Sequence, residues 1–151
     1  MILLVGSMRY LGVDYGKRRI GLAVTEAGGC ISRPFLVIAN KGLGANIAFL
    51  RELVEKEGIG CVVIGLPLRF DEDKGIYKET QMSYETKVFG EALAGSIHVT
   101  VAYHNEAYSS FEAEDYIKNT LGIKKPQKIR EMVDKVAASM ILQEYLDLVH
   151  K

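Results

Sequence analysis

The sequence predicts an α/β fold built on a mixed five-stranded sheet with helices on both faces. Three strand-like segments come first, and strand-like and helical segments alternate after them. Strands joined by short turns pair antiparallel, whereas strands joined through a helix pair in parallel with a right-handed crossover. The expected order is therefore β-β-β-α-β-α-β-α-α, with three antiparallel strands first and parallel strands after them.

The first three strands are expected over residues 9–14, 18–25 and 31–39. Apolar residues alternate with polar or small ones in the second of these segments, which is the period of a β-strand. The short turn at 15–17 predicts a hairpin between the first two strands. Pro34 predicts that the third strand lies at a sheet edge or contains an irregularity, because proline cannot donate a ladder hydrogen bond.

The middle of the chain predicts a helix, a buried strand, a loop and a second helix. Apolar residues recur at helical spacing from Ile47 to Val54, and Gly58 is expected to end that helix. The continuous apolar run 61–64 is typical of a strand buried on both faces. Residues 68–78 are polar and are expected to form a loop. A helix is expected over 79–94, on the evidence of Val88, Phe89 and Leu93.

The last third predicts one strand and two helices. Alternating apolar residues predict a strand over 97–104. Ser109 and Glu112 have the spacing of a capping box, so a helix is expected over about 110–120, closed by Gly122. A long helix is expected over about 128–148. Its buried side is expected to hold Val133, Val136, Ala137, Met140 and Ile141.

Length and composition limit the function classes. The chain of 151 residues is expected to form a single domain over 1–151. Its 19 basic and 19 acidic residues give a net charge of +0, which excludes nucleic-acid coating by bulk charge but allows a local basic patch. Cys30 and Cys61 are expected to be buried free thiols. With no signal peptide or membrane span expected in the sequence, we expect a cytoplasmic protein.

Three carboxylates are placed to meet at the strand ends. Asp14 ends the first strand, Glu106 follows the strand at 97–104, and Asp134 lies near the start of the last helix. The small residues Ala137 and Ala138 would let that helix approach the sheet. Functional groups of α/β sheets gather at the carboxyl ends of central strands. Three converging carboxylates repel one another, and a hard divalent cation such as Mg²⁺ or Mn²⁺ relieves that repulsion.

Such a cluster is suited to phosphodiester hydrolysis of the two-metal-ion type. Two ions about 4 Å apart activate a water and stabilise the leaving oxygen, so no histidine or serine nucleophile is required. Taken singly, each acid also fits an ordinary role: a turn residue for Asp14, a solvated loop residue for Glu106, and a salt-bridged helix residue for Asp134. Glu131, one turn before Asp134, fits either an outer ligand or a solvated helix face.

Several segments together resemble the motifs of the bacterial YqgF-like family, and the similarity covers about residues 9–147. That family is described as Holliday junction resolvases and as nucleases that mature the 5′ end of 16S ribosomal RNA. The resemblance implies an RNase H-like fold with Asp14, Glu106 and Asp134 as the catalytic, metal-holding carboxylates. The matching segments are Leu11–Val24, Val63–Leu68, Val133–Ala138 and Ile141–Asp147.

One motif departs from the family. The family typically carries Asp-Glu-Arg after the last strand, and this chain has Asn105, Glu106 and Ala107 there. The family's pair of threonines is replaced by Ser109 and Ser110, which can also cap a helix. The missing arginine would suit phosphate binding. Its absence leaves open a reduced contact with substrate.

Basic residues flank the three acids in the sequence, and the proposed nucleic-acid contacts are Lys17, Arg18, Arg19, Lys124, Lys125, Lys128 and Arg130. Contacts of this kind position a phosphate backbone without reading bases. Ordinary solvated faces are the alternative interpretation of both groups.

The sequence leaves several functions open. The first is a nuclease acting on structured nucleic acid, most of all in 5′-end maturation of pre-16S rRNA, with a Holliday junction resolvase as the alternative. A non-catalytic nucleic-acid-binding or ribosome-assembly factor is a further alternative. An ATP-binding domain resembling the actin and sugar-kinase folds is the remaining one, although those proteins close two such domains on the nucleotide. The residues do not determine whether the substrate is RNA or DNA, or whether the protein is a monomer or a homodimer.

Overall fold

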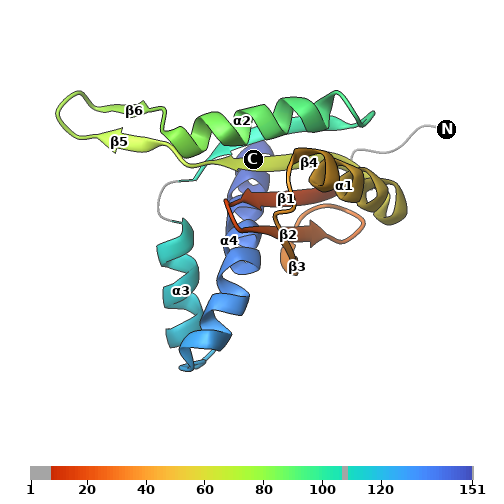
Figure 1. Cartoon of the computed structure of the whole chain (residues 1–151). Helices are drawn as coiled ribbons and strands as arrows, with labels where there is room; N and C mark the ends of the chain where they lie inside the picture. The colour runs from red at the N-terminus through yellow and green to blue at the C-terminus, as the bar shows by residue number, and fades with distance from the viewer. Residues whose placement is uncertain (1–7, 107–108, 151) are drawn as a thin grey trace.

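The computed structural model describes residues 8–106 and 109–150 of the chain. One sheet has five strands: β1 (Arg9–Tyr15), β2 (Arg19–Thr25), β3 (Ser32–Ala39), β4 (Ile59–Leu66) and β7 (Thr100–Asn105). The helices are α1 (Leu43–Glu57), α2 (Gln81–Ala94), α3 (Ser109–Asn119) and α4 (Pro126–Val149). Their arrangement is shown in Figure 1.

The strand order is β3-β2-β1-β4-β7. β1 pairs antiparallel with β2, and β2 pairs antiparallel with β3, whereas β4 lies parallel to both β1 and β7. The predicted mixed sheet is confirmed. Pro34 lies on the edge strand β3, opposite a shift of register between Leu22 and Ala23, as expected for a residue without a backbone donor.

Alternation of side chains along the strands divides the core into two layers. Leu11 and Val13 of β1 face α1 and α2, where they pack with Leu50 and Phe89. Residues of the opposite parity face α4, where Val63 packs against Leu142. Figure 1 shows α1 and α2 on one face of the sheet and α4 crossing the other. Helices on both faces, as predicted, follow from strands that are apolar on both sides.

The ends of the elements agree with the sequence in part. Gly58 takes a left-handed conformation (φ 63°) and ends α1, as predicted. The last helix begins at Pro126 rather than 128, because proline fits the first position of a helix, where its missing N–H is not needed. The strand predicted from 97 begins only at Thr100. Of the three apolar residues that indicated α2, Phe89 and Leu93 are buried, whereas Val88 is 43% exposed.

The prediction of a loop over 68–78 is wrong. β5 (Arg69–Asp71) and β6 (Ile76–Lys78) form a separate antiparallel hairpin. Phe70 lies opposite Tyr77, and their ring centroids are 5.1 Å apart. Figure 1 shows the hairpin extending away from the sheet at the left. Strands of three residues are too short to give a recognisable alternation, which is why the pattern was missed.

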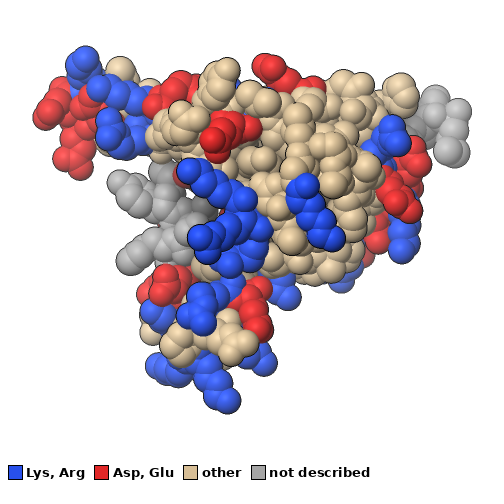
Figure 2. Space-filling model, in the orientation of Figure 1, with Lys and Arg blue, Asp and Glu red and all other residues tan. Residues whose placement is uncertain are grey.

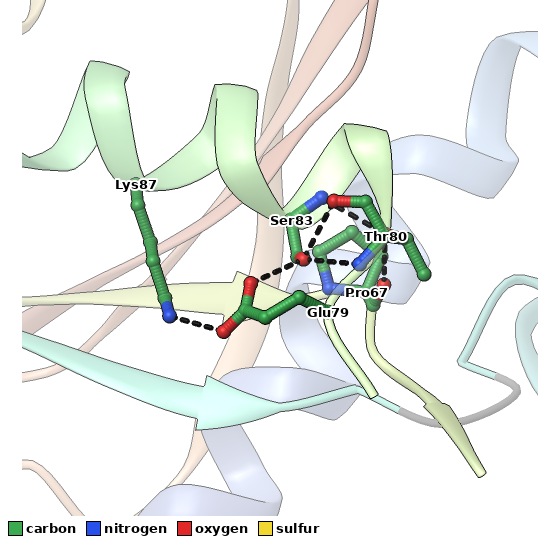
Figure 3. Close-up of polar contacts among 5 residues, drawn as sticks. All are labelled: Pro67, Glu79, Thr80, Ser83 and Lys87. Carbon is green, nitrogen blue, oxygen red and sulfur yellow. Dashed lines mark hydrogen bonds and ion pairs between the residues drawn. The ribbon is translucent and has the colours of Figure 1, made fainter. Parts of the chain in front are cut away.

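A polar network ties the hairpin to the start of α2 (Figure 3). The hydroxyl of Thr80 donates to the backbone carbonyl of Pro67 at 2.7 Å and accepts from the backbone N–H of Ser83 at 3.0 Å. The Ser83 hydroxyl accepts from the backbone N–H of Thr80, which completes a capping box. Glu79 accepts from Ser83 and pairs with Lys87. The two ends of the hairpin are therefore held at one point.

α3 packs on the first half of α4, and together they project from the sheet (Figure 1). This pair has its own apolar cluster, which includes Ala113, Ile117, Ile129 and Val136. The helix predicted to close near Gly122 does so, and that glycine has a φ of 71°. The predicted cap by Ser109 concerns side chains outside those that the structure describes.

Two further expectations concern the cysteines and the membrane. Cys61 is a buried free thiol as predicted, whereas Cys30 is also free but exposed, because it precedes the edge strand β3 instead of lying within it. In the described part of the chain, no helix is long and apolar enough to cross a membrane.

Candidate active site

Two glycines leave space for α4 on one face of the sheet. A Cβ atom at Gly12 of β1 would lie 2.8 Å from the Cβ of Leu142, and one at Gly21 of β2 would overlap the backbone carbonyl of Asp134. Neither contact is possible for a real side chain without a shift of the helix. The missing side chains therefore let α4 approach the backbone of β1 and β2 directly. The sequence had predicted this close approach only from the small residues Ala137 and Ala138 of the helix.

This close approach brings Asp134 to Asp14. Asp14 follows Gly12 by two residues, so its side chain points to the same face, at the carboxyl end of β1. In the antiparallel pair of β1 and β2, Asp14 lies directly opposite Gly21. Since Gly21 touches the backbone of Asp134, the two carboxylates become neighbours although 120 positions separate them in the sequence.

Glu106 reaches the same point from β7. Its backbone N–H donates to the carbonyl of Leu66 at 2.9 Å, which holds it beside the end of β4. Its Oε2 atom fills the space that a side chain on Gly65 would need, 2.6 Å from the Cβ position there. The side chains of Glu106 and Asp14 are joined by a hydrogen bond. The structure thus brings together all three acids that the sequence singled out.

The electrostatics of Asp14 reflect this crowding. Burial raises the pKa of Asp14 from its ordinary value of 3.8 to about 7, and the Asp134 carboxylate adds to the rise. The hydrogen bond with Glu106 lowers the pKa, but not enough to offset those two effects. A carboxyl group that keeps its proton near neutral pH is one whose charge lacks compensation, and perturbed groups of this kind cluster at functional sites.

Asp134 has one compensating charge. The Nε of Arg19 donates to its Oδ2 at 2.6 Å, at the rim of the site. Over the described residues, no set of three or more Asp, Glu, His or Cys side chains is arranged so that it could hold a metal ion. Asp134 and Glu106 both neighbour Asp14, but the Asp134 carboxylate pairs with the Arg19 guanidinium and does not join the other two acids around one point.

The donor set nevertheless fits a hard divalent cation. Asp14, Glu106 and Asp134 supply carboxylate oxygens only, which is the chemistry that Mg²⁺ and Mn²⁺ prefer. Burial and the neighbouring Asp134 carboxylate raise the pKa of Asp14, so the ionised form of Asp14 is penalised in this site. A cation there would compensate the charges that burial and repulsion now penalise.

The basic residues fall into two groups. Lys17 and Arg18 are exposed in the turn between β1 and β2, next to Asp14. The second group surrounds a cavity of about 320 Å³ between α3 and α4, whose basic lining residues are Lys118, Lys124 and Arg130. Lys125 and Lys128, also predicted to contact nucleic acid, are exposed at the start of α4. Figure 2 shows Lys and Arg gathered on the projection and on the body above it.

This second group lies near the acids in space as well as in sequence. Arg130 precedes Asp134 by four residues, one helical turn, which is a rise of about 6 Å on the same side of α4. Lys118 lies in the same basic stretch of the sequence but was not among the predicted contacts, and it lines this cavity too. Glu131 is exposed and accepts a hydrogen bond from Gln127, which favours its solvated role. Ala107 lies outside the described residues.

A family model described as "RuvX: Holliday junction resolvase" matches residues 8–148. The chain belongs to the RuvX family. The resemblance found in the motifs is confirmed. One RuvX relative, from Chloroflexus aggregans and named "Putative pre-16S rRNA nuclease", is 38% identical over 137 residues, 91% of this chain and 92% of that protein. A relative of the same name from Syntrophus aciditrophicus is 33% identical over 94% of this chain and 90% of its own.

Solved structures confirm the RNase H-like fold expected for a RuvX chain. Thermus thermophilus RuvC in complex with a Holliday junction aligns with a TM-score of 0.57 at 16% identity, covering 95% of this chain and 96% of that chain. The fowlpox virus Holliday junction resolvase aligns with a TM-score of 0.54 at 14% identity, covering 93% and 99%. At these identities the likeness concerns the arrangement of strands and helices alone.

Proposed function

We propose that this chain is a nuclease that hydrolyses phosphodiester bonds of structured nucleic acid with the help of divalent cations. The observation that carries the proposal is Asp14, held at the carboxyl end of β1 against both Asp134 and Glu106 with a pKa of about 7. A purely nucleic-acid-binding protein has no use for three converging acids. They repel phosphate and cost stability unless a cation joins them.

In this proposal Asp14, Glu106 and Asp134 hold Mg²⁺ or Mn²⁺ through their carboxylate oxygens. The bound ions supply the activation of a water and the stabilisation of the leaving oxygen. Asp14 is the best oriented of the three, because its strand is central in the sheet and its backbone is held by pairing on both sides. Glu106 and Asp134 come to it from β7 and α4.

The flanking basic residues would position the phosphate backbone. Lys17 and Arg18 extend from the turn after Asp14, and the cavity formed by Lys118, Lys124 and Arg130 lies along α4 beyond Asp134. Positive charge on two sides of an acidic centre lets a polyanion approach that the acids alone would repel. Such contacts read the shape of a backbone and not its bases, which favours a structured substrate.

Pre-16S ribosomal RNA is the first candidate substrate, because relatives with 33–38% identity over more than 90% of this chain carry that name. A four-way DNA junction is the second, because the RuvX family is described as a Holliday junction resolvase. A resolvase cuts two strands symmetrically and would act as a homodimer, whereas a nuclease that trims an RNA end needs only one copy.

A cleavage assay tests the proposal and separates the two substrates. The protein is incubated with a precursor 16S fragment or with junction DNA, in Mg²⁺, Mn²⁺ or EDTA. We expect cleavage only with the cation. Asp14→Asn should lower the rate at least about 100-fold, a loss typical of removing one electrostatic group from an active site. Asp147→Asn removes an exposed carboxylate from the far end of α4 and serves as the matched control.

Two results would contradict the proposal. Cleavage that survives Asp14→Asn unchanged would remove this acid from the mechanism. Tight binding of either substrate with no cleavage in any cation would favour the non-catalytic binding factor, and it would leave the three acids without the role proposed here.

A further inference from the structure

An ion pair joins Arg19 to Asp134 of the candidate site. The guanidinium Nε donates to Oδ2 of Asp134 at 2.6 Å. The Arg19 side chain is 48% exposed and that of Asp134 is 21% exposed. One partner thus belongs to the solvent-facing rim, while the other belongs to the acidic centre.

The fold builds this pair. Arg19 precedes Gly21 by two residues in β2, so both face α4. Gly21 lies against the backbone of Asp134. This contact brings Arg19 within reach of the Asp134 side chain. The two partners are 115 positions apart in the sequence. Their meeting therefore depends on the same close approach of α4 that creates the site.

The pair gives Asp134 a charge partner that belongs to the protein itself. A charge-assisted hydrogen bond between arginine and a carboxylate is roughly twice as strong as one between neutral groups. The described residues hold no ready-made set of three metal-binding side chains, and Arg19 is the cation in contact with Asp134. A divalent ion that is to use Asp134 has to compete with this guanidinium.

We infer that Arg19 is the resident counter-cation of Asp134, which leaves the carboxylate when a divalent cation binds and thereby sets how tightly the empty site takes that cation. The inference rests on the proposed function. Since half of the Arg19 side chain is already in solvent, the guanidinium can move away without opening the core. Asp14 and Glu106 are joined to each other by a hydrogen bond and stay in place.

This competition has a consequence for how the site is loaded. A free protein with Arg19 in place binds the cation weakly. Phosphate oxygens of the substrate add further ligands, because Mg²⁺ binds through few carboxylates together with substrate phosphates. Substrate would then tighten metal binding, whereas in the protein without substrate a higher cation concentration is needed to displace Arg19 from Asp134.

Calorimetric titration with Mg²⁺ and with Mn²⁺ tests the inference without using activity. Arg19→Gln should lower the dissociation constant about fivefold, the effect of removing one partly exposed ion pair that opposes binding. The control is Arg18→Gln, which removes one positive charge from the neighbouring exposed residue. Among the described residues, the ion-pair partner of Asp134 is Arg19 and not Arg18. Arg18→Gln should change the dissociation constant by less than Arg19→Gln does. Unfolding curves show whether each variant folds like the parent.

A second measurement follows the side chain itself. In a ¹H–¹⁵N spectrum the Nε–H signal of Arg19 is identified by its loss in Arg19→Lys. Mg²⁺ should shift that signal in the parent protein and leave it unchanged in Asp14→Asn, in which the cation site is impaired.

Each outcome decides one point. If Arg19→Gln weakens cation binding, or tightens it no more than Arg18→Gln does, Arg19 orients Asp134 or is indifferent to the site, and the inference is wrong although the proposed function stands. If neither the parent protein nor Arg19→Gln binds a cation, or if binding is equally strong after Asp14→Asn, the proposed function fails and the inference fails with it.

Discussion

Gly21 lies directly against the backbone carbonyl of Asp134, so close that a methyl group at position 21 would overlap it. Through this contact α4 carries a carboxylate to the end of β1. Asp14 faces Gly21 across the β1–β2 pair, so the same contact that seats the helix also determines the separation of the two acids. The acidic centre is thus a product of backbone packing as much as of its own side chains.

Gly21→Ala should therefore damage the fold and the site together. The added methyl group forces α4 away from β2, and overpacking of this kind costs about 1–3 kcal/mol of unfolding free energy. We expect a loss at the upper end of that range, because the overlapping atom is backbone and not a flexible side chain. Denaturant unfolding measures the loss, and calorimetry with Mn²⁺ should show weaker cation binding.

Gly44→Ala is the matched control for that substitution. Gly44 lies in α1, and a Cβ atom there would meet no other atom within 4 Å. Alanine is the better helix former, so this variant should gain about 0.5–1 kcal/mol. Equal stability of the two variants would show that the approach of α4 does not depend on the missing side chain.

Asp14→Asn should make the cation-free protein more stable at alkaline pH. The folded state holds the Asp14 proton up to a pKa of about 7, whereas the unfolded chain releases it near 3.8. Between these values the folded state binds more protons, so the unfolding free energy falls as pH rises. The loss of unfolding free energy caused by the Asp14 charge is absent below pH 3.8 and complete above about pH 7. The difference between the two pKa values corresponds to a loss on the order of 4 kcal/mol.

Denaturant unfolding in EDTA at pH 4, 6 and 8 measures this effect. The parent protein should lose stability across the series relative to Asp14→Asn, and the difference should be largest at pH 8. Parallel curves for the two proteins would mean that Asp14 carries no unfavourable charge in the folded state. Asp147→Asn, at an exposed position of α4, should follow the parent.

Much of the fold was predictable because it depends on local patterns. The buried run of β4 and the alternation in β2 indicated strands, and Gly58 marked a helix end. The hairpin of β5 and β6 was not predictable in the same way. Its strands have three residues each, and the exposed pair Phe70 and Tyr77 gives no core-facing period.

The three candidate acids could be selected from the sequence, whereas their contacts could not. Asp14, Glu106 and Asp134 were singled out from their places after strands and on the last helix, and the structure brings them together. Arg19 was expected to contact nucleic acid, which stays a prediction, and its ion pair with Asp134 was not foreseen. That pairing depends on how α4 packs across β2, a contact between distant segments that no local pattern of residues contains.

Substitutions in the basic cavity between α3 and α4 should weaken nucleic-acid binding in a manner that depends on salt. Lys124→Gln and Arg130→Gln each remove one lining charge, so each should reduce the slope of log affinity against log salt by about one unit. Filter binding to the preferred substrate over a range of salt measures this slope. Lys56→Gln, on the exposed side of α1, should leave it unchanged. Equal slopes for all three variants would exclude the cavity as a phosphate contact.

Thr80→Ala should loosen the base of the β5–β6 hairpin. The substitution removes the bond to the Pro67 carbonyl and one half of the capping box. Loss of a helix cap costs about 1 kcal/mol, and the carbonyl left without its donor adds to that cost. Thermal unfolding measures the change, with the exposed Gln81→Ala in the same helical turn as control. A variant as stable as the parent would mean that this network does not hold the hairpin.

The most direct measurement is anomalous diffraction from a crystal soaked in Mn²⁺. The central claim is that Asp14, Glu106 and Asp134 together form a cation site. It predicts an anomalous peak within bonding distance of carboxylate oxygens from all three, with Arg19 moved off Asp134. A peak elsewhere on the protein, or none near these acids at saturating Mn²⁺, would contradict it.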